Sequence, residues 1–114
     1  MTTDTLSHVF AALADPTRRD MVARLAEGDA TANQLAEPYR MTLQAVYKHL
    51  RVLEDAGLVT RPPGPQPRAV HLEVQVFDLM DNWIERHRRR AEQRYRRLDA
   101  LLAEIGDEPD GDDA

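Results

Sequence analysis

The stretch TLQAVYKHLRVLEDAG, residues 42–57, constrains the fold more than any other part of the chain. Three apolar residues in it recur at helical spacing and form a single stripe, namely Val46, Leu50 and Leu53. Thr42 can cap the first turn through its hydroxyl, and Gly57 can adopt the left-handed conformation that ends a helix. The stretch therefore predicts a helix with one side in a core and the opposite side free to contact a partner.

A short helix is expected just before this one. Thr31 and Gln34 are spaced as a capping box at its start, and Pro38 prevents it from continuing. Leu35 and Ala36 should face inward. Because the break before the next helix is short, the pair predicts a helix-turn-helix, in which the second helix enters the major groove of DNA.

Two strands joined by a proline-rich tip are expected after the same helix. Residues 58–61 have strand character, and on the second strand apolar residues alternate with polar ones, at Val70, Leu72 and Val74. Four of the seven prolines lie in residues 62–67, so this tip cannot pair as sheet. A hairpin in this place completes the layout of a winged helix-turn-helix. Arg61 and Arg68 flank the tip as natural phosphate contacts of a wing.

Two further helices are expected nearer the N-terminus. The first has apolar residues at helical spacing, at Leu6, Val9, Phe10 and Leu13. Asp15 can cap the second, and Pro16 suits its first position, where a missing N–H costs nothing. The second helix should run to about Glu27, stop at Gly28 and turn three residues inward, at Met21, Val22 and Leu25.

A long helix is expected at residues 77–105, where apolar residues recur every seven positions, at Phe77, Ile84, Ala91, Leu98 and Ile105. Such a helix extends ~43 Å at ~1.5 Å per residue, too far for so small a core to cover. We therefore expect a homodimer. Its interface is placed on this helix and the first one, at Val9, Phe10, Phe77, Met80, Trp83, Ile84, Ala91 and Leu98. Seven arginines between Arg86 and Arg97 are interpreted as a solvated face.

Length and composition bound the class of protein. A chain of 114 residues has room for one domain with a modest core, and no tract approaches the ~18 consecutive apolar residues needed to span a bilayer. The start MTTDTLS is polar and lacks the pattern of a secretory signal, so we expect a cytoplasmic protein without membrane contact. Cysteine is absent, which excludes disulfides, thiolate metal sites and thiol redox switches.

The charge is unevenly distributed along the chain. The net charge is −5, yet the last nine residues alone carry five acidic residues and no basic one. The stretch 40–68 has five basic residues against two acidic ones, a local charge of +3. Because phosphate attraction depends on the local surface, the acidic total does not exclude a DNA-binding protein. We expect one DNA-binding and dimerisation domain at residues 1–105 and an acidic disordered tail at residues 106–114.

Three segments carry a family resemblance: FAALADPTRRDMVARLAEG, QLAEPYRMTLQAVYKHLRVLEDAGLVTR and NWIERHRRRAEQRYRRLDALLAE. Together they resemble the ArsR family of bacterial transcriptional regulators, in a branch with no obvious metal motif and a long tryptophan-bearing last helix. The resemblance spans residues 9–104 and is most specific in KHLRVLEDAGLV. It implies a homodimeric winged helix that binds an operator and usually represses transcription. The expected fold is mainly α with a small β-hairpin, and a two-fold dimer should bind a palindromic operator.

The residues expected to contact double-stranded DNA follow from the exposed face of the recognition helix and from the wing. They are Thr31, Thr42, Leu43, Gln44, Tyr47, Lys48, His49, Arg51, Arg61 and Arg68. The chain departs from the family pattern at three of its positions. Arg40 stands where glycine or asparagine is usual and is expected to need a positive φ, Tyr47 replaces a frequent serine, and Leu43 replaces a residue that is commonly polar.

A metal site is not expected. Metal-sensing relatives use cysteines before the turn, which this chain lacks, or combine histidines and carboxylates on the last helix. That helix has a single histidine, His87, and scattered carboxylates, a poor match for tetrahedral zinc. We interpret His8 and His71, like His87, as packing or surface residues. A metal-responsive sensor that uses last-helix ligands nevertheless remains one alternative.

No enzymatic function and no cofactor are expected. The chain has no cysteine nucleophile, no glycine-rich phosphate loop and no grouping of Ser, His and Asp beyond chance. A second alternative is a winged helix that binds another protein instead of DNA, which the acidic tail and Leu43 make conceivable. Salt-insensitive binding to a protein, without retention of DNA, would favour that alternative.

Overall fold

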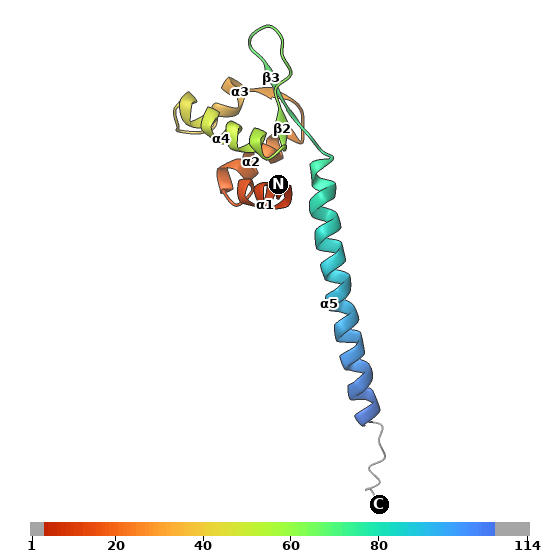
Figure 1. The fold of residues 1–114 in the computed structure, drawn as a ribbon. Helices are drawn as coiled ribbons and strands as arrows, with labels where there is room; N and C mark the ends of the chain where they lie inside the picture. Colours follow the sequence, from red (N-terminus) through yellow and green to blue (C-terminus); the bar gives the residue numbers. More distant parts are fainter. Residues whose placement is uncertain (1–3, 107–114) are drawn as a thin grey trace, which may run out of the picture. The chain divides into compact units, whose positions relative to one another are not determined.

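The computed structural model describes residues 4–106 and divides into two units, Met1–Leu79 and Met80–Ala114. Figure 1 shows the order of the elements along the chain. They are α1 (Thr5–Ala12), α2 (Pro16–Leu25), β1 (Ala30–Thr31), α3 (Ala32–Ala36), α4 (Leu43–Asp55), β2 (Val59–Thr60), β3 (Ala69–Leu72) and α5 (Val76–Gly106). The predicted mainly α fold with a winged helix-turn-helix is confirmed.

Three helices of the first unit, α2, α3 and α4, begin at the predicted capping residues. Asp15 Oδ2 accepts a first-turn N–H of α2 at 3.0 Å, and Pro16 is the first residue of that helix. Thr31 and Gln34 form a complete capping box at α3, with hydrogen bonds of 3.2 and 2.9 Å. Thr42 Oγ1 accepts an N–H of α4 at 3.1 Å. Each cap satisfies N–H groups that a helix leaves without partners at its start.

Gly57 stops α4, whose last residue is Asp55, as the sequence predicts. Gly57 has a φ of 81°, a conformation that side chains with a Cβ rarely adopt. Its N–H donates to the carbonyl of Glu54, and the next N–H, from Leu58, donates to the carbonyl of Leu53, both at 2.9 Å. This pair of bonds is a Schellman motif, which ends the helix and turns the chain directly into β2.

The core of the first unit consists of apolar side chains from all its helices and from the sheet. Every residue predicted to face inward on α2 and α4 is buried, as is Leu35 of α3. On α1 only Val9, among the predicted residues, is fully buried, while Phe10 keeps 37% of its surface exposed. Among residues 4–106 no charged or polar residue is buried, so burial of apolar surface is the main source of stability.

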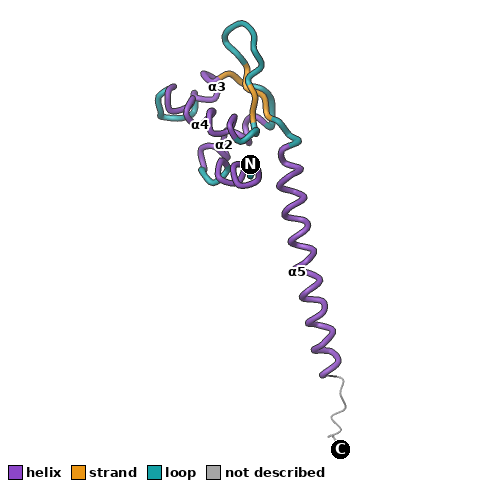
Figure 2. The backbone as a smooth tube through the Cα atoms, in the orientation of Figure 1, coloured by secondary structure: helices purple, strands orange, loops and turns teal. Residues whose placement is uncertain are grey.

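The sheet has three antiparallel strands in the order β1-β3-β2, whereas the sequence predicts only two (Figure 2). β1 was missed, and it pairs Ala30 with Val70. β3 has the predicted alternation, but it ends at Leu72, so the expectation for Val74 was wrong. Val74 is 64% exposed and lies in the turn that leads into α5, where its carbonyl accepts the N–H of Phe77. The proline tip forms no strand, as predicted.

The turn of the helix-turn-helix, residues 37–42, corrects one expectation. No residue other than glycine has a positive φ between residues 4 and 106, so the expected strain at Arg40 is absent. Six residues are enough to reverse the chain within ordinary backbone conformations, beginning with a hydrogen bond of 2.9 Å from the N–H of Tyr39 to the carbonyl of Ala36.

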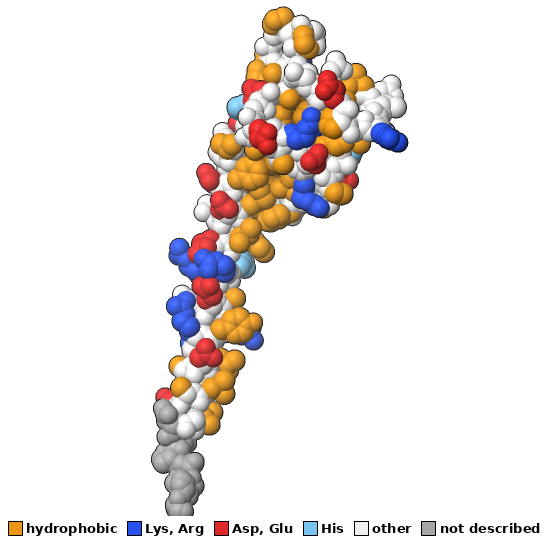
Figure 3. Space-filling view, turned by 180° about the vertical axis from the view of Figure 1, so that it is seen from behind, with side chains coloured by type: hydrophobic (Ala, Val, Ile, Leu, Met, Phe, Trp, Pro, Cys, Tyr) orange, Lys and Arg blue, Asp and Glu red, His pale blue; other side chains and the backbone are white. Residues whose placement is uncertain are grey.

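The second unit is the greater part of α5, whose 31 residues match the predicted long helix. Met80 is the only buried residue of the whole helix. Acidic and arginine side chains pair along it, as in the bonds of Arg88 to Glu85 at 2.6 Å and to Glu92 at 2.7 Å. Hydrophobic side chains gather along one side of its C-terminal half (Figure 3). They are Tyr95, Leu98, Leu101, Leu102 and Ile105.

Two further observations concern the C-terminal residues and the possibility of a membrane-spanning helix. Of the predicted acidic tail at residues 106–114, Gly106 is the last residue of α5, and the others lie outside the described residues. Within residues 4–106, no helix combines the length and the apolar character needed to cross a bilayer.

Candidate nucleic-acid interface

α4 separates a buried face from a face that is open to solvent. Its apolar stripe is completely buried, which fixes the rotation of the helix about its axis. Four polar side chains at helical spacing then lie on the exposed side, at Gln44, Tyr47, Lys48 and Arg51. A shallow depression of ≈ 540 Å³ follows this face and is continued by Val52 and Asp55. The exposed face therefore offers hydrogen-bond donors and acceptors, one aromatic ring and two positive charges.

The turn that leads into α4 is held by α2. Arg24, on α2, donates through its Nη atoms to the carbonyls of Leu35 and Gln34 at 2.7 and 2.9 Å, which satisfies the C-terminal end of α3. Its guanidinium also lies 5.5 Å from the ring centroid of Tyr39. Tyr39 in turn donates its hydroxyl hydrogen to Asp20. Burial, and then this bond to a carboxylate, raise the pKa of Tyr39, so it stays a neutral donor.

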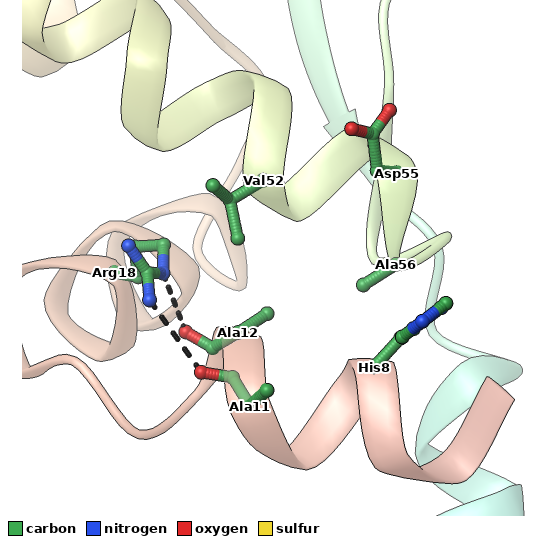
Figure 4. Close-up of a pocket in the computed structure, with 7 residues that line it drawn as sticks. All are labelled: His8, Ala11, Ala12, Arg18, Val52, Asp55 and Ala56. Atoms are coloured by element: carbon green, nitrogen blue, oxygen red, sulfur yellow. Dashed lines mark hydrogen bonds between the residues drawn. The ribbon is translucent and has the colours of Figure 1, made fainter. Parts of the chain in front are cut away.

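The side of α4 that faces α2 is held by a polar group around His49. Its Nδ1 lies 3.3 Å from Nη1 of Arg18 and 4.0 Å from Oδ2 of Asp15. The same arginine donates to the carbonyls of Ala12 and Ala11 at 2.7 and 3.5 Å, as the dashed lines in Figure 4 show. Arg18 thus ties the end of α1 to both α2 and α4.

A cavity of ≈ 360 Å³ lies beside this contact, between α1, α2 and the end of α4. Figure 4 shows His8 and Asp55 at one side of it and Arg18 at the other, with small apolar side chains between them. Because Arg18 already donates to two carbonyl groups, it has little capacity left to bind a ligand in the cavity.

Arg61, at the base of the wing, is bound to α4. Its Nε donates to Oε2 of Glu54 at 2.7 Å, and both side chains are 27% exposed. The hydrogen bond to this carboxylate raises the pKa of Arg61. Its guanidinium lies 5.5 Å from the ring centroid of Tyr47, at cation–π distance. The predicted phosphate contact is therefore already joined to two residues of the recognition helix, two turns apart on one face.

Arg68 closes the neck of the wing. It donates through Nη2 to the carbonyl of Arg61 and through Nε to the carbonyl of Pro62 at 3.3 Å. A polar cavity of ≈ 120 Å³ lies between this neck and the start of α3. Its polar lining is Thr31, Asn33, Tyr47, Arg61, Gln66 and Arg68.

The structure thus brings most of the predicted DNA-contacting residues to two adjoining places. The exposed face of α4 holds Gln44, Tyr47, Lys48 and Arg51, and the wing base holds Arg61, Arg68 and Thr31. Two predicted residues differ in environment: the Thr42 hydroxyl is used as a cap, and His49 turns toward α2. Leu43 is 40% exposed at the first turn of α4.

Sequence reasoning missed residues that act through distant partners. Glu54, Arg24 and Arg18 were given no role, although each joins two elements of the helix-turn-helix. The sequence alone predicts that Glu54 and Tyr47 share a face of the helix, since they are seven residues apart. No pattern along the chain indicates that Arg61 would reach both.

The residues predicted for the dimer interface differ in exposure. Val9 is fully buried within one protomer and Met80 is 7% exposed, so neither has much surface to give to a partner. Trp83, Ile84 and Leu98 are 38%, 49% and 50% exposed. Phe77 is half-buried and Ala91 is exposed. Trp83 stacks on His87 with ring centroids 4.2 Å apart.

Within the part of the chain that the structure describes, the titratable side chains show no arrangement that could hold a metal ion. Across residues 4–106, no three side chains of His, Asp or Glu come together in a cluster with that capacity. His71 binds Asp29 at 2.9 Å, and His87 Nδ1 contacts the backbone carbonyl of Trp83 at 2.8 Å. The ring nitrogens in these contacts are used by the fold.

Comparisons with known proteins agree with this geometry. The family described as "Helix-turn-helix domain" matches residues 13–62, which include α2, α3 and α4. The chain is 30% identical over 79 residues to the transcriptional repressor SdpR of Bacillus subtilis, a match that spans 69% of this chain and 88% of SdpR. It is 36% identical over 89 residues to the HTH-type transcriptional regulator Rv2034 of Mycobacterium tuberculosis, spanning 78% of this chain and 83% of that protein.

A solved structure extends the comparison beyond the helix-turn-helix. A crystal structure of an ArsR family transcriptional regulator superposes with a TM-score of 0.75 at 35% identity, covering 78% of this chain and 98% of the other. The match in fold, the exposed polar face of α4 and the sequence identity to two transcriptional regulators all indicate the same family. The chain belongs to the ArsR family of winged helix-turn-helix, DNA-binding transcriptional regulators.

Proposed function

We propose that the protein is a transcriptional repressor that binds a palindromic operator as a homodimer. A two-fold dimer presents two copies of α4 to successive major grooves, so the half-sites should be about one helical turn, ~34 Å, apart. Repression is supported by the similarity to a named repressor, SdpR. The homodimer is supported by the exposed hydrophobic side chains along α5.

One observation carries this proposal, namely the division of α4 into two faces. The stripe of Val46, Leu50 and Leu53 is 0% exposed, so the rotation of α4 about its axis is fixed. The polar face must therefore point outward. A helix held in this way, with polar side chains outward, has the form of a recognition helix. Its two cationic groups, Lys48 and Arg51, favour an anionic partner over an apolar protein surface.

The exposed residues divide into base-reading and phosphate-holding groups. The amide of Gln44 suits adenine, and the ammonium of Lys48 suits guanine. Tyr47, held against Arg61, offers a hydroxyl to a base edge. The phosphate contacts are assigned to Thr31, Arg51, Arg61 and Arg68.

Selection of DNA fragments from the source genome by the purified protein tests this proposal. The expected result is a small set of sequences that share an imperfect palindrome, with half-sites separated by about one helical turn. Gel-shift titration of one selected duplex against a scrambled duplex of equal length then measures discrimination. Sequence-specific binding would be contradicted if the selected fragments shared no motif, or if the protein bound both duplexes with equal affinity.

Repression needs its own measurement. A reporter gene whose promoter contains the selected operator should be transcribed less when the protein is expressed. The matched control is the same promoter with the scrambled duplex in place of the operator. Increased transcription from the operator-bearing promoter would show activation and would remove the repressor assignment while leaving DNA binding in place.

A further inference from the structure

We infer that Glu54 is a positioning residue for sequence recognition, and that it acts through Arg61 on Tyr47. The inference rests on the proposed function, since it concerns how the DNA-reading face is held. Glu54 is itself an acid and would repel phosphate. Its value to a DNA-binding surface must therefore come from what it orients.

The geometry joins three side chains in one row. Glu54 and Tyr47 lie two turns apart on the same face of α4, and Arg61 reaches across from the wing to both. The guanidinium is held by two contacts to the carboxylate, at 2.7 and 3.4 Å. Paired contacts of this kind fix the plane of an arginine as well as its position. The flat cation is thereby kept beside the Tyr47 ring.

The contact with Arg61 restricts the rotamers of Tyr47, which lies on the exposed face of α4. Tyr47 is 42% exposed, and a tyrosine at such a site would otherwise sample several rotamers. The cation beside its ring favours one of them. A fixed phenol can discriminate between base edges, whereas a mobile one contacts any sequence with similar energy.

The same contact also moderates attraction to phosphate. Glu54 partly neutralises Arg61, so the wing base has less free positive charge than its sequence indicates. Removal of the carboxylate should release the guanidinium to phosphate on any duplex. Glu54→Gln should therefore have two opposite effects, namely higher affinity for unrelated DNA and lower discrimination in favour of the operator.

The control variant is Glu27→Gln. Glu27 follows α2, is exposed, and its side chain makes no ion pair or hydrogen bond in the part of the chain that the structure describes. The substitution makes the same change of residue and charge within the same unit, away from Arg61 and from the exposed face of α4. An effect of the net charge alone would be equal in the two variants.

The experiment measures binding to the selected operator and to a scrambled duplex, over a series of salt concentrations, by fluorescence anisotropy. For Glu54→Gln we expect about a tenfold fall in the ratio of the two affinities. The salt slope on the scrambled duplex should steepen by at most about 0.9, the value for one full phosphate contact, because Glu54 no longer offsets the charge of Arg61. Glu27→Gln should leave the ratio unchanged.

A double variant tests the path through Tyr47. Tyr47→Phe alone should lower discrimination because it removes the hydroxyl. In the Glu54→Gln background the same change should have a much smaller effect, because the hydroxyl is no longer held in place. Additive effects of the two changes would overturn the path from Glu54 to Tyr47.

The outcomes separate this inference from the proposed function. Equal discrimination in wild type, Glu54→Gln and Glu27→Gln would overturn the inference and leave operator binding intact. A wild-type protein that binds both duplexes equally would overturn the proposed function, and the inference with it. If Glu54→Gln fails to fold, as judged by circular dichroism, Arg61→Lys replaces it. That variant keeps the charge but loses the flat cation, and full discrimination in it would overturn the inference.

Discussion

The guanidinium of Arg24 lies 5.5 Å from the ring centroid of Tyr39, and this contact fastens the turn of the helix-turn-helix to α2. Arg24 is part of a larger arrangement in which it also satisfies two carbonyls at the end of α3, while Tyr39 donates to Asp20. α3 has only 5 residues, too few to be stable by itself. Its position before α4 therefore depends on contacts made by its neighbours.

Replacement of Arg24 by alanine should destabilise the first unit. Two carbonyls at the end of α3 would lose a charged donor, at a cost of about 1–3 kcal/mol in the free energy of unfolding. Tyr39→Phe should cost less, since the ring remains. Urea unfolding followed by circular dichroism measures both. Arg86→Ala, at an exposed position on α5, is the control and should change the midpoint little. An Arg24→Ala midpoint equal to that of the control would contradict this role.

Gln44→Ala should relax the base preference of the proposed operator complex. The amide lies on the exposed face of α4, so its loss should cost ~1–3 kcal/mol on the preferred base and little on the other bases. Gel-shift titration against a set of operators that differ at single base pairs measures this preference. Gln93→Ala, on α5, is the control. An unchanged preference at every base pair would assign the reading of bases to other residues.

Arg68→Ala should weaken binding to all sequences alike. The side chain holds the neck of the wing and lines the small polar cavity beside α3. Its removal should take away the phosphate contact that we propose for it. The salt slope should become shallower by about one unit. Arg68→Lys retains the charge and should retain most of the slope. Selective loss of affinity for the operator alone would show that Arg68 reads bases instead.

The pair formed by His71 and Asp29 should make stability depend on pH. The hydrogen bond to Asp29 raises the pKa of His71 above 6.5, with a smaller contribution from Glu73. Because the pKa of His71 is raised in the folded state, the pair with Asp29 stabilises the fold fully below pH 6.5. This stabilisation is lost as the pH rises through the pKa of the folded state. Asp29→Asn should therefore lower the melting temperature at about pH 5.5 and much less at about pH 9. A difference that grows with pH would contradict this sign.

Leu98→Glu should dissociate the proposed homodimer. Leu98 is 50% exposed among other hydrophobic side chains of α5, and a carboxylate there would have to be buried against the partner chain. Sedimentation equilibrium measures the fraction of monomer. Gln93→Glu adds the same charge on another face of the helix and should leave the dimer unchanged. If both variants stay dimeric, the interface lies elsewhere.

The elements that could be predicted from sequence are those whose signals are local. α4 was predicted from the spacing of three apolar residues, a cap and a stop glycine, all within one stretch of chain. α5 was predicted in the same way, to within one residue at each end. Local periodicity and capping decide where a helix starts and ends, so no knowledge of the remaining fold was needed.

The features that escaped prediction depend on contacts between distant segments. β1 has 2 residues and no alternation of its own, so it exists only because β3 lies beside it. Arg61 was predicted from its flanking position as a phosphate contact, yet its strongest partner is Glu54, which the chain brings near by turning at Gly57. Arg40 was expected to be strained because of a family pattern, although the turn is long enough to avoid it.

The exposed length of α5 has a consequence for the cell. A helix of 31 residues with a single buried side chain gains little stability from its own protomer. In the proposed assembly, a second copy covers the exposed side chains of the helix, so the active species is the dimer. While most of the protein is monomeric, the equilibrium concentration of the dimer rises with the square of the protein concentration. Occupancy of the promoter should then rise more steeply than gene dosage. A modest change in synthesis or degradation of the protein would be converted into a sharp change in transcription.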